Sequence, residues 1–280
     1  MKPATLLPPV EFISPLPKAI DESSGIAKSK RYPDKDIFWT HNDSGDSARI
    51  FAIDGKGKLI REVPIPNATN VDWEEISMDE KGRIVMCDIG DNFKKRAFIV
   101  LYRFAEPDAL DANDAVKDVQ AFRFRYPKGQ GPFDAEGLVT RAGNAYLFTK
   151  EMDGTRFYRL PLPEACPTEA VEAEFLTETK TFSIVTAASL TDDGRHLALL
   201  NYLSVVVIDL PEPFEKIAQT PEGIASIFKL LRRVRLGFHG QTEGICWDKN
   251  DLLITSENGK DMHLGKEFGE MFRVKGVLGE

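Results

Sequence analysis

Short apolar runs recur along the whole chain. Each is followed by a polar or glycine-containing turn and then by a second run rich in aromatic or β-branched residues. One example is "VTRAGNAYLFTK" at residues 139–150, where the turn sequence "RAGN" separates two such runs. This composition and spacing are typical of antiparallel strands rather than helices. The pattern predicts an all-β protein.

Five segments carry the same phrase, a small or acidic residue followed by Ile or Leu. They are "ESSGIA" at 22–27, "DWEEIS" at 72–77, "DAEGLV" at 134–139, "TAASLT" at 186–191 and "QTEGIC" at 241–246. Their aligned fourth positions, 25, 75, 137, 189 and 244, are 50, 62, 52 and 55 residues apart. A period of this size, filled by about four strands, is typical of the blades of a β-propeller.

Both ends of the repeat support a closed ring. The first four copies have a fourth strand, expected within residues 60–65, 119–126, 172–182 and 226–236, whereas the fifth copy lacks one. An orphan strand, residues 10–17, precedes the first copy. If that strand completes the last blade, the ring hides its edges. We therefore predict a five-bladed β-propeller of four-stranded blades, a single domain over 1–280, with blades starting near 22, 72, 134, 186 and 241.

Two segments interrupt the period. In "TPEGIASIF", residues 220–228, a sixth copy of the phrase is conceivable, but Gly223 lies only 21 residues before Gly244, too few for a blade. We expect this segment to form a loop or a short helix. Residues 106–116, "EPDALDANDAV", are expected to be an insertion that lengthens the second repeat.

Propeller topology brings the five phrases to one rim, because the first strand of each blade lines the channel and starts where the second strand ends. Strand alternation places the first and third positions of each phrase on the same side. The first positions are Glu22, Asp72, Asp134, Thr186 and Gln241. The third positions are Ser24, Glu74, Glu136, Ala188 and Glu243.

Three glutamates around a narrow axis would repel one another unless their pKa values rise or a cation binds. Carboxylates together with a hydroxyl favour a hard cation, Ca²⁺ first and Mg²⁺ as the alternative. The predicted metal ligands are Ser24, Glu74, Glu136 and Glu243. The competing interpretation is that these acids bond to backbone amides at the strand starts.

The column of Ser24, Glu74, Glu136 and Glu243 resembles that of the soluble calcium-activated nucleotidases (apyrases). The resemblance implies a five-bladed propeller with a central Ca²⁺ held by Ser and Glu side chains. Ala188 stands where that family has Ser. The phrases "DESSGIA", "HNDSG" and "DIGDN" also resemble a bacterial group of esterase-like propellers related to phytases.

Candidate catalytic groups accompany the ring. His41, in "WTHNDSGD", is expected in a rim turn, where it is either a general base or an ordinary turn residue. The acids Asp43, Asp72 and Asp134 are the other candidate bases. Lys150 is either a counter-ion of the carboxylates or a clamp for a substrate anion. The GxSxG, P-loop and HExxH templates are absent from the sequence.

Charge and cysteine content limit the classes of binding partner and the cellular compartment that we expect for this protein. A net charge of −8 and a pI near 5.2 disfavour nucleic acids and anionic membranes. Three separated cysteines without a CxxC motif suggest a reducing compartment. The N-terminus lacks the apolar region of a signal peptide, so we expect a cytoplasmic monomer, or a periplasmic or secreted one if a signal was removed.

Two functions remain open at this level. The first is a metal-dependent hydrolase of a small phosphorylated or ester substrate, or of a glycoside, working at the rim. The second is a non-enzymatic propeller that binds a ligand or a protein and uses its ion only to join the blades. The fold alone does not choose between them, because propellers serve both purposes.

Overall fold

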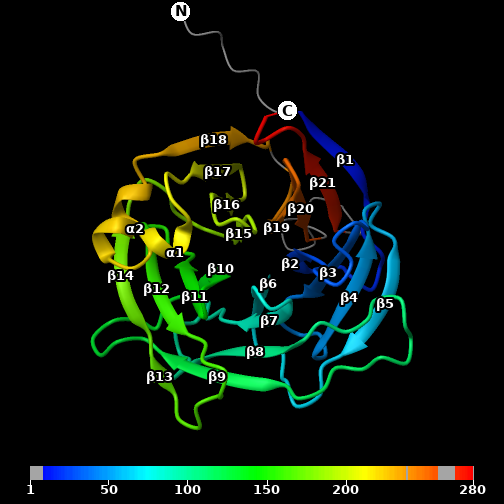
Figure 1. The fold of residues 1–280 in the computed structure, drawn as a ribbon, viewed down its shortest axis with the longest axis horizontal. Helices are drawn as coiled ribbons and strands as arrows, with labels where there is room; N and C mark the ends of the chain where they lie inside the picture. Colours follow the sequence, from blue (N-terminus) through cyan, green and yellow to red (C-terminus); the bar gives the residue numbers. More distant parts are fainter. Residues whose placement is uncertain (1–8, 238, 258–268, 280) are drawn as a thin grey trace, which may run out of the picture.

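The computed structural model describes residues 9–237, 239–257 and 269–279. In these residues the chain forms five sheets arranged in a ring around a central axis (Figure 1), and all their strand pairs are antiparallel except one short parallel pair in the second sheet. Four sheets have four strands, and the second has a short fifth strand at its outer edge. The predicted five-bladed β-propeller is confirmed.

Within blades one to four the strands follow chain order outward from the axis. Blade one has β2 (Ser23–Lys28), β3 (Ile37–Asn42), β4 (Arg49–Asp54) and β5 (Leu59–Pro64). Blade two has β6 (Trp73–Met78), β7 (Arg83–Asp88), β8 (Ile99–Ala105) and β9 (Gln120–Arg125), with β13 (Val171–Glu172) beside β9. Blade three has β10 (Ala135–Arg141), β11 (Asn144–Thr149), β12 (Thr155–Pro161) and β14 (Glu174–Thr179). Blade four has β15 (Ala187–Leu190), β16 (His196–Asn201), β17 (Ser204–Asp209) and β18 (Leu231–Arg235).

Blade five combines the two ends of the chain. It has β19 (Thr242–Asp248), β20 (Asp251–Ser256), β21 (Glu270–Val274) and, outermost, the N-terminal strand β1 (Val10–Pro15). β1 pairs antiparallel with β21, and Phe12 lies opposite Phe272. The orphan strand of the sequence therefore closes the ring, as Figure 1 shows where the blue and red strands meet.

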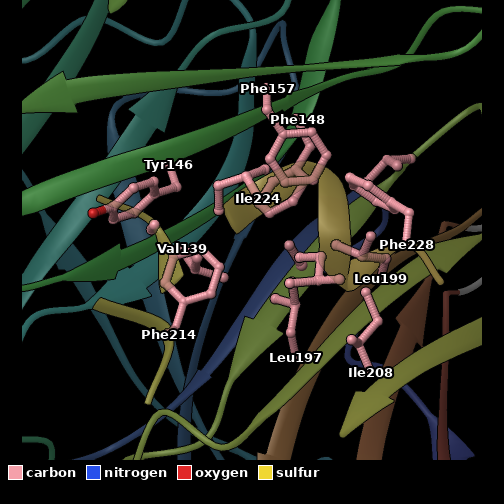
Figure 2. Packing of buried hydrophobic residues seen from close by; sticks show 14 of the residues in the cluster. Val139, Tyr146, Phe148, Phe157, Leu197, Leu199, Ile208, Phe214, Ile224 and Phe228 are labelled. Atoms are coloured by element: carbon pink, nitrogen blue, oxygen red, sulfur yellow. The ribbon is translucent and has the colours of Figure 1, made fainter. Parts of the chain in front are cut away.

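The core consists of five apolar clusters, one at each seam between neighbouring blades. Figure 2 shows the seam between blades three and four, where the Phe148 and Phe157 rings lie 4.2 Å apart. Alternate residues of each strand face opposite seams, so nearly every residue in the inner strands of each blade is buried. This packing fixes the orientation of the blades and hence of the rim.

The same seam contains two short helices, α1 (Phe214–Ile217) and α2 (Pro221–Ile227). The side chain of Thr220 caps α2 by accepting the amide of Gly223, and Ile224 and Ile227 are buried. The expected short helix within residues 220–228 is therefore confirmed. The fourth strand of this blade begins at Leu231 rather than at 226, because α2 extends to Ile227 and a turn over 228–230 follows it.

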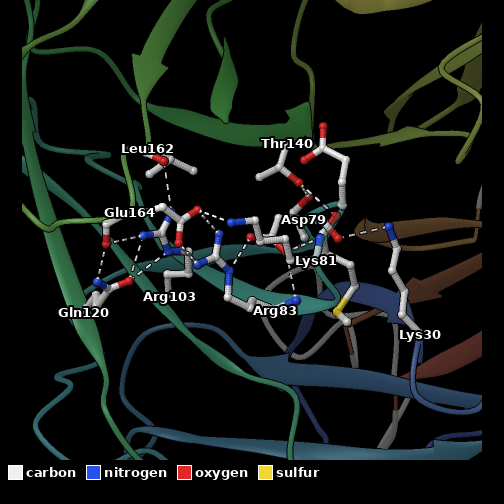
Figure 3. Close-up of polar contacts among 12 residues, drawn as sticks. Lys30, Asp79, Lys81, Arg83, Arg103, Gln120, Thr140, Leu162 and Glu164 are labelled. Atoms are coloured by element: carbon white, nitrogen blue, oxygen red, sulfur yellow. Dashed lines mark hydrogen bonds and ion pairs between the residues drawn. The ribbon is translucent and has the colours of Figure 1, made fainter. Parts of the chain in front are cut away.

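A buried arginine joins blades two and three (Figure 3). Arg103 on β8 is 1% exposed and donates to the carbonyl oxygens of Leu162 and Pro163 at 3.0 and 2.7 Å, and to Gln120. Its donors are thus satisfied without a partner carboxylate. Residues 106–119, which follow this strand, form turns and no strand or helix, as expected for an insertion.

Candidate functional site

Four of the five innermost strands carry a β-bulge at the same place. The pairing with the second strand shifts between Ser23 and Gly25 in β2, and the equivalent shift occurs in β6, β10 and β19. β15 pairs regularly through Ala187 and Ala188. A bulge adds an unpaired residue and re-aims its side chain. The four extra residues are the predicted metal ligands, Ser24, Glu74, Glu136 and Glu243.

The structure divides these four residues into two pairs. The hydroxyl of Ser24 donates to Glu74 Oε2 at 3.2 Å, across the seam between blades one and two. On the other side the ammonium of Lys150 contacts Glu136 Oε1 and lies 3.9 Å from Glu243 Oε1. Of the two roles expected for Lys150, its geometry is that of a counter-ion to this second pair.

Tyr202 completes the environment of Lys150. Its hydroxyl donates to Glu243 Oε1 at 3.2 Å, and its ring centroid lies 5.4 Å from the lysine Nζ. The cation therefore has a carboxylate on two sides and an aromatic ring on a third. This arrangement holds Lys150 in place at the mouth of the channel.

A group of three carboxylates lies beside the first pair. Asp43, from the loop after β3, and Asp72 and Glu74, from the start of β6, each offer one oxygen, and these oxygens lie within 4.8 Å of one another. Two ligands at about 2.4 Å from one Ca²⁺ are at most about 4.8 Å apart. The spacing therefore fits a single bound cation.

Gly90 leaves the space that this group needs. A Cβ atom at this position would lie 2.2 Å from Glu74 Oε1 and 2.5 Å from Asp72 Oδ2. Any other residue would push the two carboxylates away, so the glycine allows the backbone to approach them closely. Gly90 follows β7, in the loop that ends at the same rim.

The carboxylates of Asp43, Asp72 and Glu74 repel one another. Burial raises the pKa of Asp43 to about 7, and the carboxylates of Glu243 and Asp72 add to the shift. Burial, with the neighbouring Asp134, also raises the pKa of Asp72. Burial, followed by Glu136 and Asp43, raises the pKa of Glu74 well above its ordinary value. A divalent cation would remove this repulsion, so the residues fit such an ion.

Asp134 lies next to the group, at the start of blade three. Its Oδ1 accepts the backbone amide of Asp91 at 2.9 Å and so ties blade three to the loop that contains Gly90. The side chain is 6% exposed and lines a pocket together with Lys150. The structure therefore brings Asp43, Asp72 and Asp134 to one mouth, as the topology predicted.

His41 lies elsewhere. It is the fifth residue of β3 rather than part of a rim turn, it is 0% exposed, and its ring packs edge-on against Trp73 with centroids 6.1 Å apart. Nδ1 contacts the carbonyl oxygen of Asn42 at 3.0 Å. Burial lowers its pKa to about 4. The expected rim position is wrong, because the second strand extends one residue beyond the histidine.

Sequence reasoning missed Glu75. Its carboxylate is 0% exposed and accepts the backbone amides of Ile76 and Ala188, both at 3.0 Å. Burial raises its pKa well above the ordinary value. Two departures from the repeat signalled this contact: Glu75 stands where three blades have glycine, and Ala188 stands where three blades have glutamate.

Three solved structures are similar to this chain, and the first of them supports the fold. The PQQ-bound aldose sugar dehydrogenase of Streptomyces coelicolor is similar over 95% of this chain and 99% of its own, with 9% identity and a TM-score of 0.51. A gluconolactonase of Xanthomonas campestris matches over 96% of both chains, with 14% identity and a TM-score of 0.47. A glucose dehydrogenase matches over 95% of this chain and 86% of its own, with 10% identity and a TM-score of 0.47.

A scan of protein-family models and a search of curated proteins gave no match. Among the described residues, no helix has the length and apolar character needed to cross a membrane. The resemblance to apyrases and to phytase-related propellers stays a prediction, since no comparison tests it at the level of residues. At these identities the structural likeness shows the propeller fold alone. Any activity has to be inferred from the residues at the rim of the channel.

Proposed function

We propose that this propeller binds a divalent cation, Ca²⁺ or Mg²⁺, at Asp43, Asp72 and Glu74, and that it hydrolyses a small ester or phosphorylated substrate at the same rim. The supporting observation is the convergence of three carboxylate oxygens within 4.8 Å, from two blades. Asp43 and Asp72 are partly exposed, whereas Glu74 is buried. The site therefore has a protein side and an open side, the arrangement of catalytic rather than closed structural metal sites.

A bound divalent cation would polarise a carbonyl or phosphoryl oxygen. The chain's own groups would do the rest. Ser24 holds Glu74 by its hydrogen bond, and Gly90 keeps the backbone clear of the carboxylates. Asp134, at the edge of the mouth, is the group we assign to take a proton from the attacking water. This assignment keeps Asp43 and Asp72 as ligands.

The second pair of predicted ligands, Glu136 and Glu243, has a different role in this proposal. Glu136 and Glu243 hold the ammonium of Lys150 at the mouth, with Tyr202 above it. In this position the ammonium balances the two buried carboxylates and fixes this side of the mouth. The ligand set predicted from the sequence thus shares Glu74 with the proposed site, while Ser24 positions Glu74, and Glu136 and Glu243 position Lys150.

A purely structural ion is the second candidate. It is favoured by the Ser24–Glu74 hydrogen bond, which crosses the seam between blades one and two and involves side chains that are 0% and 2% exposed. An ion at Glu74 would then join two blades and raise the stability of the ring. The protein would act as a binding propeller without turnover.

One experiment separates these functions. Calcium affinity is measured by calorimetry, and hydrolysis of p-nitrophenyl acetate and p-nitrophenyl phosphate is measured with Ca²⁺ and with a chelator. Asp72→Asn should lower both calcium affinity and turnover about tenfold or more. Asp34→Asn, at an exposed turn before β3, is the matched control. Unchanged affinity in Asp72→Asn would refute the site, and a calcium-stabilised protein without turnover would favour the structural ion.

A further inference from the structure

Large apolar side chains lie on three of the loops at the rim. Phe93, Met152 and Leu203 are 81%, 86% and 59% exposed. They lie in the loops after β7, β11 and β16, which are equivalent loops of three consecutive blades. Because every second strand ends at the rim, all three residues lie around the same opening. Met152 and Phe93 are the most exposed of the large hydrophobic side chains in the described part of the chain.

A pocket lies between two of these loops. Its volume is about 450 Å³, within the range of small-molecule sites, and Met152 and Phe133 form apolar parts of its wall. The Phe133 ring is fixed by Tyr126, with centroids 5.4 Å apart. Asp134 and Lys150 also line the pocket, so it opens directly beside the proposed site.

The three cationic side chains of this pocket are already paired with carboxylates. Lys94 binds Glu151 at 2.7 Å and thereby joins the two loops, and Arg156 binds Asp153 at 3.1 Å. Lys150 contacts Glu136. An anionic group of the substrate that entered this pocket would have to break one of these ion pairs to find a cationic partner. An uncharged apolar group would instead bury Met152 and Phe133 without disturbing them.

We propose that this pocket binds the apolar acyl or aryl group of the substrate, so that the substrate class is an ester of a hydrophobic acid or alcohol. This inference rests on the proposed function, because it assigns the bond to be hydrolysed to the neighbouring carboxylates. The pocket holds the apolar group on the side of blades two and three. Its size admits a small molecule and not a folded partner.

The test is a comparison of acyl chain lengths. Each methylene group that becomes buried strengthens binding by up to about fourfold. In the calcium-loaded protein, kcat/KM should therefore rise about tenfold or more from p-nitrophenyl acetate to p-nitrophenyl hexanoate. Met152→Ser should reduce this ratio severalfold. The control, Leu110→Ser, changes a side chain that is 52% exposed on the opposite face and should keep the ratio.

A binding measurement keeps the two proposals separable. Calorimetric titration with 1-hexyloxy-4-nitrobenzene, an ether that is not hydrolysed, reports on the pocket alone. Turnover of the acetate without a preference for the hexanoate, or ether binding that is the same in Met152→Ser, overturns the pocket and leaves the hydrolase intact. Ether binding that depends on Met152, without turnover of any ester, supports the pocket and overturns the hydrolase.

Discussion

The carboxylate of Glu75 accepts a hydrogen bond from the backbone amide of Ala188, 3.0 Å away, although blade three separates the blades to which these residues belong. The bond therefore crosses the channel. The same carboxylate accepts the amide of Ile76 on its own strand. Glu75 directly follows Glu74, so this brace lies immediately below the carboxylate mouth and fixes the bulge that presents Glu74.

Glu75→Ala should destabilise the protein by about 2–4 kcal/mol, because two buried amides lose their acceptor. The midpoint of urea unfolding measures the loss. Glu212→Ala, an exposed glutamate before α1, serves as the control and should change stability by less than about 0.5 kcal/mol. A small effect in Glu75→Ala would mean that water or a rearranged backbone satisfies these amides.

Gly90→Ala should lower calcium affinity by about tenfold or more, because the added methyl group occupies the space of the Glu74 and Asp72 carboxylates. Calorimetry measures the affinity, and a urea titration of the same variant shows whether the fold is retained. A folded variant that binds calcium as tightly as the native chain would place the ion away from Gly90.

Much of this architecture is visible in the sequence because a propeller repeats one unit. The phrase that opens each blade recurs often enough to give the blade number, and the surplus strand at residues 10–17 reveals the closure. The ring of Ser24, Glu74 and their equivalents follows from the same alignment. These features depend on local pattern and on topology, both of which a sequence contains.

The finer geometry depends on contacts between blades, which no local pattern contains. Strand alternation predicts that the side chain at the third position of each phrase shares a side with the first position. In the structure a β-bulge changes the direction of that side chain. The polar residues after His41 predict a turn at this position, yet β3 continues through Asn42. The choice of Glu136 and Glu243 as partners of Lys150 likewise depends on which carboxylates converge across the channel.

The stability of the metal-free protein should fall as the pH rises from about 5 to about 7.5. The folded state holds the Asp43 pKa at about 7, above its ordinary value of 3.8. A proton is thus bound more tightly in the folded state, and its contribution, complete below about pH 4, is lost as the pH approaches 7. Thermal unfolding in the presence of a chelator measures this slope.

Calcium should reverse the same trend, because its ligands must be deprotonated. The increase in melting temperature on adding Ca²⁺ should therefore be larger at about pH 7.5 than at about pH 5. Asp43→Asn should flatten the slope of the metal-free protein. A slope that is identical in Asp43→Asn would show that other groups cause the pH dependence.

Lys150→Met removes the cation that lies between Glu136 and Glu243, whose side chains are 3% and 4% exposed. Because two buried carboxylates then lack a counter-ion, we expect a loss of about 3–5 kcal/mol near neutral pH. The loss should be smaller at about pH 5, where protonation relieves the repulsion. Lys229→Met, at an exposed position, is the control for loss of one positive charge.

Two further measurements on this variant address the ring predicted from the sequence. The double variant Glu136→Gln/Lys150→Met should recover most of the stability, since it removes one of the two repelling charges. Calcium should stabilise Lys150→Met more than it stabilises the native chain, because the ion can replace the ammonium between the glutamates. If calcium has no greater effect on the variant, Glu136 and Glu243 are partners of a lysine only, and the ring of Ser24, Glu74, Glu136 and Glu243 cannot act as one metal site.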